Sequence, residues 1–493
     1  MLRSMKTDFF VFLCRKIPST ITIYLKHMKK QMILLALSLL TALNLQAGPY
    51  EQYYQQLPIQ MNEPVLPTQP SNTVKLTDFG GVGDGITDNT EAFRKAISTL
   101  QKQGGGRLIV TQGVYLTGMI VLKSNIDLHV ERNAMIQFSP DKQLFLKRDK
   151  TTGQVTGEKA QPGITASKCQ NISITGQGII DGNGEWWRAV KRSKVSDVEW
   201  KAFREMGGTV TDDGSLWYPF NLKHFSNIAD DYKRQEQMRV HMIRLTDCEN
   251  VLVKDVTLQN APKFHLVPQR CKNVTIDGVN VRCPWNAQNG DGIDIMQCRD
   301  VLIVNSRVDV GDDGICLKGG VGADGVKHGG CENLLIQDNI VFHAHGGFVI
   351  GSEFSGGMQN IVVRGNTFSG TDTGLRFKSG AGRGGKTGRI FISDIFMNDI
   401  KDEAITIETT YADNPVGTSG RKATGEEFLP EFCDIDISRV VCRDCETAVS
   451  AHGTIEMIHD IRLKDCTFFY TKKAYDIDAE TMFQTQNVKM ATF

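Results

Sequence analysis

The sequence predicts an all-β protein built as a single parallel β-solenoid, with a helix covering its N-terminal end. Two short strand patterns recur through the body of the chain at spacings of roughly 20 to 35 residues, the range typical of stacked structural repeats. Glycine is frequent, with 48 residues, whereas proline is not, with 14, which suits a turn-rich β structure better than a helical one. A length of 493 residues would suggest about three domains, but one solenoid also accounts for it.

The first repeat is a cysteine or apolar residue, any residue, an asparagine or aspartate, and then alternating aliphatic residues. Its copies begin at Cys169, Cys248, Cys271, Cys298, Cys331, Met358, Phe432 and Ile458. Such alternation is typical of a strand. Stacked copies would place the cysteines in an inward column and the Asn or Asp residues in a ladder of turns. The cysteines are therefore expected to be reduced core residues, and no Cys-x-x-Cys motif has the matching partner motif that a zinc site needs.

The second repeat is a short strand that follows a glycine or alanine. Its copies begin at Gly292, Gly314, Gly347, Gly374 and Ala404. Two strands that recur at a steady offset in each coil strengthen the prediction of a solenoid.

A helix is expected just before the repeats begin. Asp88 is a candidate N-cap, with Glu91 three residues later as in a capping box, and the glycines from Gly104 end the segment. The apolar residues between them have helical spacing. An open solenoid end exposes core and unpaired strand edges, so this helix is the natural cap.

The N-terminal region has the pattern of a secretory signal peptide. A basic pair at Lys29 precedes an apolar run that ends near Ala47, before the chain turns polar. The resulting division is an upstream extension at 1–27, a signal peptide at 28–47, a linker at 48–73 and the solenoid at 74–493. The alternative, a membrane anchor, is disfavoured because the run is short for a bilayer span. We expect a secreted, periplasmic protein with no membrane attachment after cleavage.

The composition excludes two further classes. The chain is 40% hydrophobic, with 56 basic and 56 acidic residues. The apolar fraction is too high for a disordered protein, and there is no basic excess to drive nucleic-acid binding.

The second repeat brings ionisable residues into register. Asp291 and Asp313 each precede the aligned glycine, and His345 shares the position of Asp312, one residue further back. Arg376 shares the position of Asp294, and Lys378 shares that of Lys318. Because neighbouring coils lie about 4.8 Å apart, these groups should gather on one face. An isolated Asp-Gly is more often a turn, but this number of groups in register favours an acid–base site such as glycoside hydrolysis needs.

These segments resemble the motifs of a known family. NGDGID at 289–294, GDDG at 311–314, HG at 345–346 and RFK at 376–378 are similar to the four motifs of the polygalacturonases, glycoside hydrolase family 28. The resemblance extends to 78–90 and 176–187. It implies a right-handed parallel β-helix and hydrolysis of α-1,4-galacturonosidic bonds, with inversion of configuration, in polygalacturonan. Gly290, Ala344 and Phe377 depart from the motifs without removing an ionisable group, so only subsite shape is put in doubt.

The resemblance also implies roles for individual residues. Asp312 would be the general acid, Asp291 and Asp313 would activate the water, and His345 would tune or orient the acid. The residues implied in substrate binding are Asn289, Arg376, Lys378, Arg383 and Tyr411. The segment at 379–389 looks like that of bacterial exo-acting enzymes, although its basic residues Arg383, Lys386 and Arg389 fit a solvated loop equally well. For Tyr411 a packing role is an equal alternative.

A long insertion at 188–238 interrupts the repeats and carries Trp200, Trp217, Tyr218 and Phe220. Long loops in compact proteins are usually functional. We expect this one to wall one end of the cleft and restrict attack to chain ends.

Three alternative functions remain open. A rhamnogalacturonan hydrolase would share the carboxylates, a pectate lyase would use calcium, and a carbohydrate-binding solenoid would need no acid–base set. We expect no cofactor and no metal, and an acidic polysaccharide or oligosaccharide, galacturonan, as partner. The oligomeric state is not indicated.

Overall fold

The computed structural model describes residues 48–149, 152, 154–219, 239–411 and 427–492. The chain divides into two units, Met1–Gln56 and Leu57–Phe493. The described part of the first unit holds one 3₁₀ helix, η1 (Glu51–Tyr54). The predicted extension and signal peptide lie outside the described residues. Within the described part of the chain, no helix is long and apolar enough to cross a membrane.

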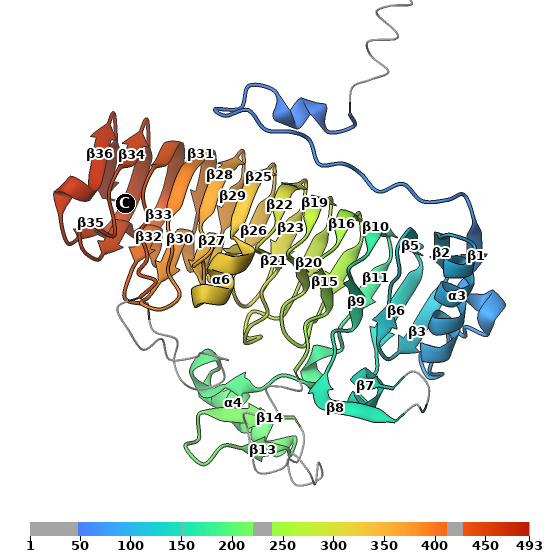
Figure 1. Ribbon diagram of the computed structural model, residues 1–493. Helices are drawn as coiled ribbons and strands as arrows, with labels where there is room; N and C mark the ends of the chain where they lie inside the picture. Colours follow the sequence, from blue (N-terminus) through green and yellow to red (C-terminus); the bar gives the residue numbers. More distant parts are fainter. Residues whose placement is uncertain (1–47, 150–151, 153, 220–238, 412–426, 493) are drawn as a thin grey trace, which may run out of the picture. The chain divides into compact units, whose positions relative to one another are not determined.

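The second unit is a right-handed parallel β-helix, which confirms the predicted fold. Its main sheet has 32 strands that pair in parallel from coil to coil (Figure 1). Each full coil contributes one strand to each of three faces. The Cys–Asn face holds the first repeat, the site face holds the second, and the third face connects them.

The strand bounds follow from these faces. The Cys–Asn face contains β1 (Thr73–Lys75), β2 (Gly106–Val110), β5 (Ile126–Val130), β10 (Gln170–Gly176), β16 (Glu249–Lys254), β19 (Lys272–Asp277), β22 (Arg299–Val304), β25 (Cys331–Gln337), β28 (Met358–Arg364), β34 (Ile461–Lys464) and β36 (Phe483–Gln486). The third face contains β3 (Gly113–Thr117), β6 (Ala134–Phe138), β11 (Ile179–Asp181), β17 (Thr257–Gln259), β20 (Asn280–Arg282), β23 (Arg307–Asp309), β26 (Ile340–Phe342), β29 (Thr367–Ser369) and β37 (Lys489–Thr492). The site face contains β4 (Ile120–Val121), β9 (Ile164–Ser167), β15 (Ile243–Thr246), β18 (Leu266–Gln269), β21 (Ile293–Met296), β24 (Ile315–Lys318), β27 (Gly346–Ser352), β30 (Thr373–Ser379) and β32 (Glu403–Glu408). The long strands β31 (Thr387–Asn398), β33 (Ile435–His452) and β35 (Thr467–Ile477) run across more than one face.

Helix α3 (Thr90–Lys102) caps the first coil, next to β1 and β2 in Figure 1. Its inward side, with Phe93, Ile97 and Leu100, joins the core of the coils. The predicted capping box is wrong. Asn89 is the N-cap residue and makes no side-chain cap bond, because its side chain bonds Val82 and Leu116 instead. Asp88 accepts from Thr90 by its side chain, and Glu91 pairs with Arg94.

The Cys–Asn face confirms both predicted columns. All eleven described cysteines are buried and free. The Asn and Asp residues of the repeat adopt a left-handed backbone conformation, for example φ 54° at Asn273, which these residue types tolerate well. Their side chains bond from coil to coil, as from Asn250 to Asn171 at 3.1 Å and from Asn273 to Asn250 at 2.9 Å. This ladder closes the turn in each coil.

The insertion forms a small subdomain of its own, drawn in green in Figure 1. Its described part has a three-stranded antiparallel sheet and one α-helix. The elements are β12 (Val190–Lys191), η5 (Arg192–Lys194), α4 (Asp197–Glu205), β13 (Thr209–Val210) and β14 (Leu216–Tyr218). Trp217 and Tyr218 are buried within it, and Trp217 stacks on Phe203 with ring centroids 5.0 Å apart. Phe220 lies outside the described residues.

The remaining elements connect or flank the coils. These are η2 (Leu76–Phe79), η3 (Lys142–Phe145), the hairpin β7 (Leu146–Arg148) and β8 (Val155–Ala160), η4 (Gly184–Trp186), α6 (Gly322–His328) and η7 (Glu480–Met482).

Candidate active site

The ionisable residues lie where the turns enter the site-face strands. Cα pairing runs from Asp294 to Cys316, from there to Val349, and then to Arg376, which is the register expected from the glycine alignment. In β21 the isoleucines at 293 and 295 enter the core. Alternation therefore turns the side chains of Asp294 and Arg376 away from the core, toward the site face.

Asp312 lies at the centre of the cluster and accepts three hydrogen bonds. The backbone N–H of Asn289 donates to Oδ2 at 3.1 Å, and the backbone N–H of Asp313 donates to Oδ1 at 3.0 Å. His345 Nδ1 lies 3.1 Å from the same Oδ1. Burial alone would raise the pKa of Asp312, but His345, followed by Lys378 and Arg376, outweighs burial and lowers that pKa. Asp312 is thus set up as a carboxylate in the ligand-free protein.

Asp313 is held between two cations. Lys378 Nζ lies 2.7 Å from its Oδ2, and Arg376 Nη1 lies 3.2 Å from its Oδ1. Although burial would raise the pKa of Asp313, these two cations lower it. The cations expected to bind a substrate carboxylate therefore already contact a carboxylate of the protein.

Asp291 has the opposite environment. It is 3% exposed, and its Oδ1 has no hydrogen-bond partner among the described residues. Burial and then the neighbouring carboxylates of Asp294 and Asp312 raise its pKa well above the usual value. The expected repulsion between clustered carboxylates therefore raises the pKa of Asp291, whereas the pKa of Asp312 is lowered.

Asp294 is a fourth carboxylate that sequence reasoning did not include in the site. It is fully buried, and neither of its oxygens has a hydrogen-bond partner in the described part of the chain. Lys318 Nζ is 3.6 Å from Oδ1. Burial raises the pKa of Asp294 to about 7, although Lys318 opposes the shift. Its shared register with Arg376 was the signal that could have identified it.

His345 connects the cluster to the insertion. Its backbone N–H donates to the carbonyl of Asp312 at 2.9 Å, which fixes the two turns against each other. Its Nε2 lies 2.9 Å from Lys194 Nζ, in η5, and 3.8 Å from Asp372 Oδ2. Sequence reasoning missed both residues, because the register of the repeats says nothing about an insertion.

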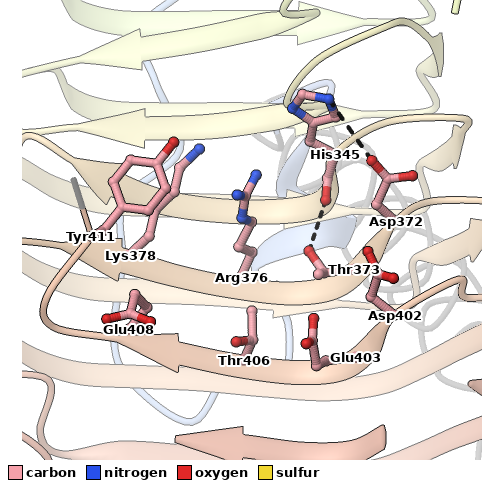
Figure 2. A pocket seen from close by; sticks show the side chains of 10 residues that line it. All are labelled: His345, Asp372, Thr373, Arg376, Lys378, Asp402, Glu403, Thr406, Glu408 and Tyr411. Carbon is pink, nitrogen blue, oxygen red and sulfur yellow. Dashed lines mark hydrogen bonds and ion pairs between the residues drawn. The ribbon is translucent and has the colours of Figure 1, made fainter. Parts of the chain in front are cut away.

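A cavity of about 320 Å³ opens beside Arg376 and Lys378. Its lining residues are His345, Asp372, Thr373, Arg376, Lys378, Asp402, Glu403, Thr406, Glu408 and Tyr411. Figure 2 shows the two basic side chains and Tyr411 toward one end, with His345 and Asp372 at the other. Burial and then nearby carboxylates raise the pKa of both Asp402 and Glu403. The cavity thus combines fixed cations with carboxyls that lose their charge readily in acid.

Tyr411 and Arg383 complete the basic end of this cavity. The cationic groups of Arg376, Lys378 and Arg383 lie 5.8, 5.2 and 5.5 Å from the centroid of the Tyr411 ring. Arg383 also donates to the Tyr411 carbonyl at 2.5 Å. Lys386, in contrast, pairs with Glu431 at 2.6 Å and is not among the residues that line the cavity.

The other two basic or polar candidates have defined positions. Arg389 has φ 55° and occupies the position of the Asn ladder, where its backbone N–H donates to Asp434 at 2.8 Å. Asn289 is held at its side-chain oxygen by Arg239, at 2.8 Å, and Arg239 also donates to the Gln288 carbonyl at 2.6 Å. Of the three basic residues at 379–389, only Arg383 therefore joins the cavity through Tyr411.

A second cavity, of about 310 Å³, lies on the other side of His345. It is lined by Lys194, Trp285, Gly311, His343, His345, Asp372 and Lys401. Trp285 is 53% exposed, unlike most aromatic side chains of the solenoid. An exposed indole beside cations is a surface on which a sugar ring packs well.

One acidic cluster at the site has the spacing of metal ligands. One ligand atom each from Asp312, Asp313 and His345 lies within 4.8 Å of the others. Calcium prefers six to eight oxygen ligands, whereas this cluster offers a ring nitrogen and contacts Arg376 and Lys378. The donor set therefore fits acid–base chemistry better than calcium binding.

Comparisons with known proteins agree with this geometry. The family model of glycosyl hydrolases family 28 matches residues 104–489. Exo-poly-α-D-galacturonosidase of Dickeya chrysanthemi is 28% identical over 401 residues, which cover 80% of this chain and 65% of the relative. A probable polygalacturonase of Vitis vinifera is 28% identical, covering 67% of this chain and 62% of the relative. This chain thus spans just under two thirds of the length of both relatives.

Two solved structures are similar as well. A hyperthermoactive exopolygalacturonase from Thermotoga maritima has a TM-score of 0.69 and 31% identity, covering 87% of this chain and 94% of that one. A family 28 exopolygalacturonase of Yersinia enterocolitica has a TM-score of 0.61 and 21% identity, covering 86% of this chain and 78% of that one. At that identity the second similarity supports the fold alone.

Proposed function

This chain belongs to glycosyl hydrolases family 28, and we propose that it is an inverting, exo-acting hydrolase of α-1,4-galacturonosidic bonds in polygalacturonan. The observation that carries the proposal is the meeting of Asp291, Asp312 and Asp313 with Arg376 and Lys378 on adjacent coils. Carboxyls supply the acid and the base of glycoside hydrolysis, and buried cations recognise a uronate.

In this proposal Asp312 protonates the glycosidic oxygen, and Asp291 and Asp313 activate the attacking water. Inverting hydrolases keep acid and base carboxyls about 6.5–9.5 Å apart so that the water fits between them. Water attacks the anomeric carbon from the side opposite the leaving group, and the product emerges with the inverted anomeric configuration. The attacking water gives its proton to the base carboxylate.

Substrate binding itself would protonate the general acid. Arg376 and Lys378 contribute to the low pKa of Asp312 in the ligand-free protein. A uronate carboxylate bound to these cations offsets their positive charge, so the pKa of Asp312 rises once substrate is in place. The proton is then available when a glycosidic bond is present to receive it. The same competition loosens the hold of the cations on Asp313, the proposed base.

The acidic wall of the first cavity favours action in mild acid. Because the pKa values of Asp402 and Glu403 are raised, these carboxyls lose their charge as the pH falls. Their loss of charge reduces repulsion of a polyanionic substrate. Arg376, Lys378 and Arg383 keep their charge over the same range.

Two contacts support exo action. Lys194 of the insertion reaches His345, and Arg239, which follows the insertion, bonds Asn289. An insertion that touches both turns narrows the approach to the cleft and favours chain ends over internal bonds. We also propose that residues 28–47 direct secretion to the periplasm, in keeping with a polymeric substrate outside the cytoplasm.

Product analysis tests the proposal. The purified protein is incubated with polygalacturonate and with rhamnogalacturonan, each with and without a chelator. We expect saturated galacturonate monomer or dimer from polygalacturonate from the earliest times, unaffected by the chelator. An unsaturated, ultraviolet-absorbing product would identify a lyase, and cleavage of rhamnogalacturonan alone would identify the related hydrolase.

A further inference from the structure

The insertion delivers a cation directly onto the imidazole beside the central carboxylate. Lys194 Nζ lies 2.9 Å from His345 Nε2, a hydrogen-bond distance. On the opposite side of the ring, Nδ1 lies 3.1 Å from Asp312 Oδ1. The three side chains therefore form one line, from the insertion through the imidazole to the central carboxylate.

The chemistry of these groups fixes where the protons lie. A lysine ammonium only donates hydrogen bonds, so Nε2 must accept, and a neutral imidazole then carries its hydrogen on Nδ1. That hydrogen points at Asp312 Oδ1. An imidazolium would instead face the ammonium with a second N–H, which like charges at this distance disfavour.

We propose that Lys194 is a positioning residue that holds His345 as the neutral imidazole, with its proton on Nδ1 and directed at Asp312. The catalytic consequence rests on the proposed function: with no imidazolium beside it, Asp312 is free to take up the proton that substrate binding favours. The insertion thereby completes the acid–base site as well as narrowing its entrance.

The surrounding charges make the ammonium decisive. Asp372 Oδ2 is 3.8 Å from Nε2, so without Lys194 an Nε2–H would lie between Asp372 and the ring while Nδ1–H faces Asp312. Two carboxylates on opposite sides would then stabilise the imidazolium. Other charged or titratable groups that share a cavity with His345 are His343, Arg376, Lys378, Lys401, Asp402, Glu403, Glu408 and Tyr411. Lys401 is itself 3.7 Å from Asp372 and partly neutralises it.

Nuclear magnetic resonance of histidine-labelled protein tests the proposal without any substrate. His345→Gln assigns the signal, and ring carbon and nitrogen shifts report the tautomer and the pKa of His345. We expect the Nδ1–H tautomer in the wild type, and a pKa of His345 about one unit higher in Lys194→Met. Lys194→Arg, which keeps the charge, should stay near the wild type. Lys201→Met is the matched control, because Lys201 lies on the same insertion with its side chain 79% exposed.

The pH dependence of kcat supplies the second readout. In Lys194→Met the loss of activity on the acidic side should begin about one pH unit higher, because an imidazolium keeps Asp312 ionised. The indole signal of Trp217, which donates to the Gly207 carbonyl within the insertion, reports whether the insertion remains folded. If that signal is lost, Lys194→Gln replaces Lys194→Met in both measurements.

Two results would overturn the proposal: the Nε2–H tautomer in the wild type, or the same pKa of His345 in wild type and Lys194→Met. Failure of the proposed function looks different. The tautomer and the pKa difference would then be as expected, while the wild type released no product from any galacturonan.

Discussion

At the scale of single residues, the site contains two kinds of carboxyl group. Asp312 and Asp313 are surrounded by donors and cations and have lowered pKa values. Asp291 and Asp294 lie deeper, have unpartnered oxygens among the described residues and have raised pKa values. Such divergence between neighbouring carboxyls is typical of acid–base sites, where environment assigns different tasks to identical side chains.

Asp294 should make the stability of the protein pH-dependent. Its pKa is about 7 in the folded protein, against 3.8 for a free side chain. Its contribution to stability is therefore fully present below pH 3.8 and is lost as the pH rises through 7. Asp294→Asn, which never ionises, should gain about 2–4 kcal/mol relative to wild type between pH 5 and pH 8. Urea denaturation at both pH values measures this, with Asp212→Asn on the insertion surface as control. A constant difference between the two proteins would contradict it.

Lys378 should contribute mainly to substrate affinity. It is buried, contacts Asp313 at 2.7 Å and faces the first cavity. Removing one member of a buried, hydrogen-bonded charge pair costs about 2 kcal/mol or more, so Lys378→Met should raise KM for oligogalacturonides roughly thirtyfold. Steady-state kinetics measure the change, and Lys386→Met, at the exposed pair with Glu431, is the control. Equal KM values for wild type and Lys378→Met would argue against uronate binding at this position.

At the scale of elements, the Asn ladder fixes the turns that present the site-face strands. Asn273 has φ 54°, is mostly buried and bonds Asn250. Asn273→Ala loses the bond and also places a Cβ residue in the left-handed region, so we expect a loss of about 2 kcal/mol in the free energy of unfolding. Asn273→Gly removes only the bond and should lose about half as much. Denaturant unfolding compares them, and the interpretation fails if alanine is tolerated better than glycine.

The insertion shows how far sequence reasoning reached at this scale. The repeats predicted the register of Asp294, Cys316 and Arg376, because each coil has one strand per face and the glycines mark its start. The pairing of Lys194 with His345 could not be predicted, because an insertion follows no repeat. The helix was expected and present, but its N-cap was misjudged because the side chain of Asn89 bonds the neighbouring coil.

At the scale of the whole molecule, the core depends on apolar burial and thiols rather than cross-links. All eleven described cysteines are free and buried. A reductant should therefore leave the thermal midpoint of the described fold unchanged, and thiol reagents should react with these cysteines only after unfolding. Calorimetry with and without dithiothreitol, together with thiol titration in and out of denaturant, measures both effects. A midpoint lowered by the reductant would show that a disulfide stabilises the fold.

The whole-molecule fold was predictable because a solenoid repeats its instructions in every coil. Strand alternation, the cysteine column and the Asn turns all agree, and agreement across levels is what specifies a fold. The electrostatics of the site were not predictable in the same way. Whether a carboxyl such as Asp291 or Asp312 gains or loses a proton depends on burial and on cations from other coils, which spacing alone does not reveal.

The anomeric configuration of the first product tests the central claim most directly. Oligogalacturonide is digested by the wild type and by Asp312→Asn while proton resonance spectra are recorded, before the product mutarotates. We expect the wild type to release saturated galacturonate in the inverted, β configuration, and Asp312→Asn to lose about 10²–10⁴-fold in kcat. Release of the α anomer, or full activity of Asp312→Asn, would contradict the account.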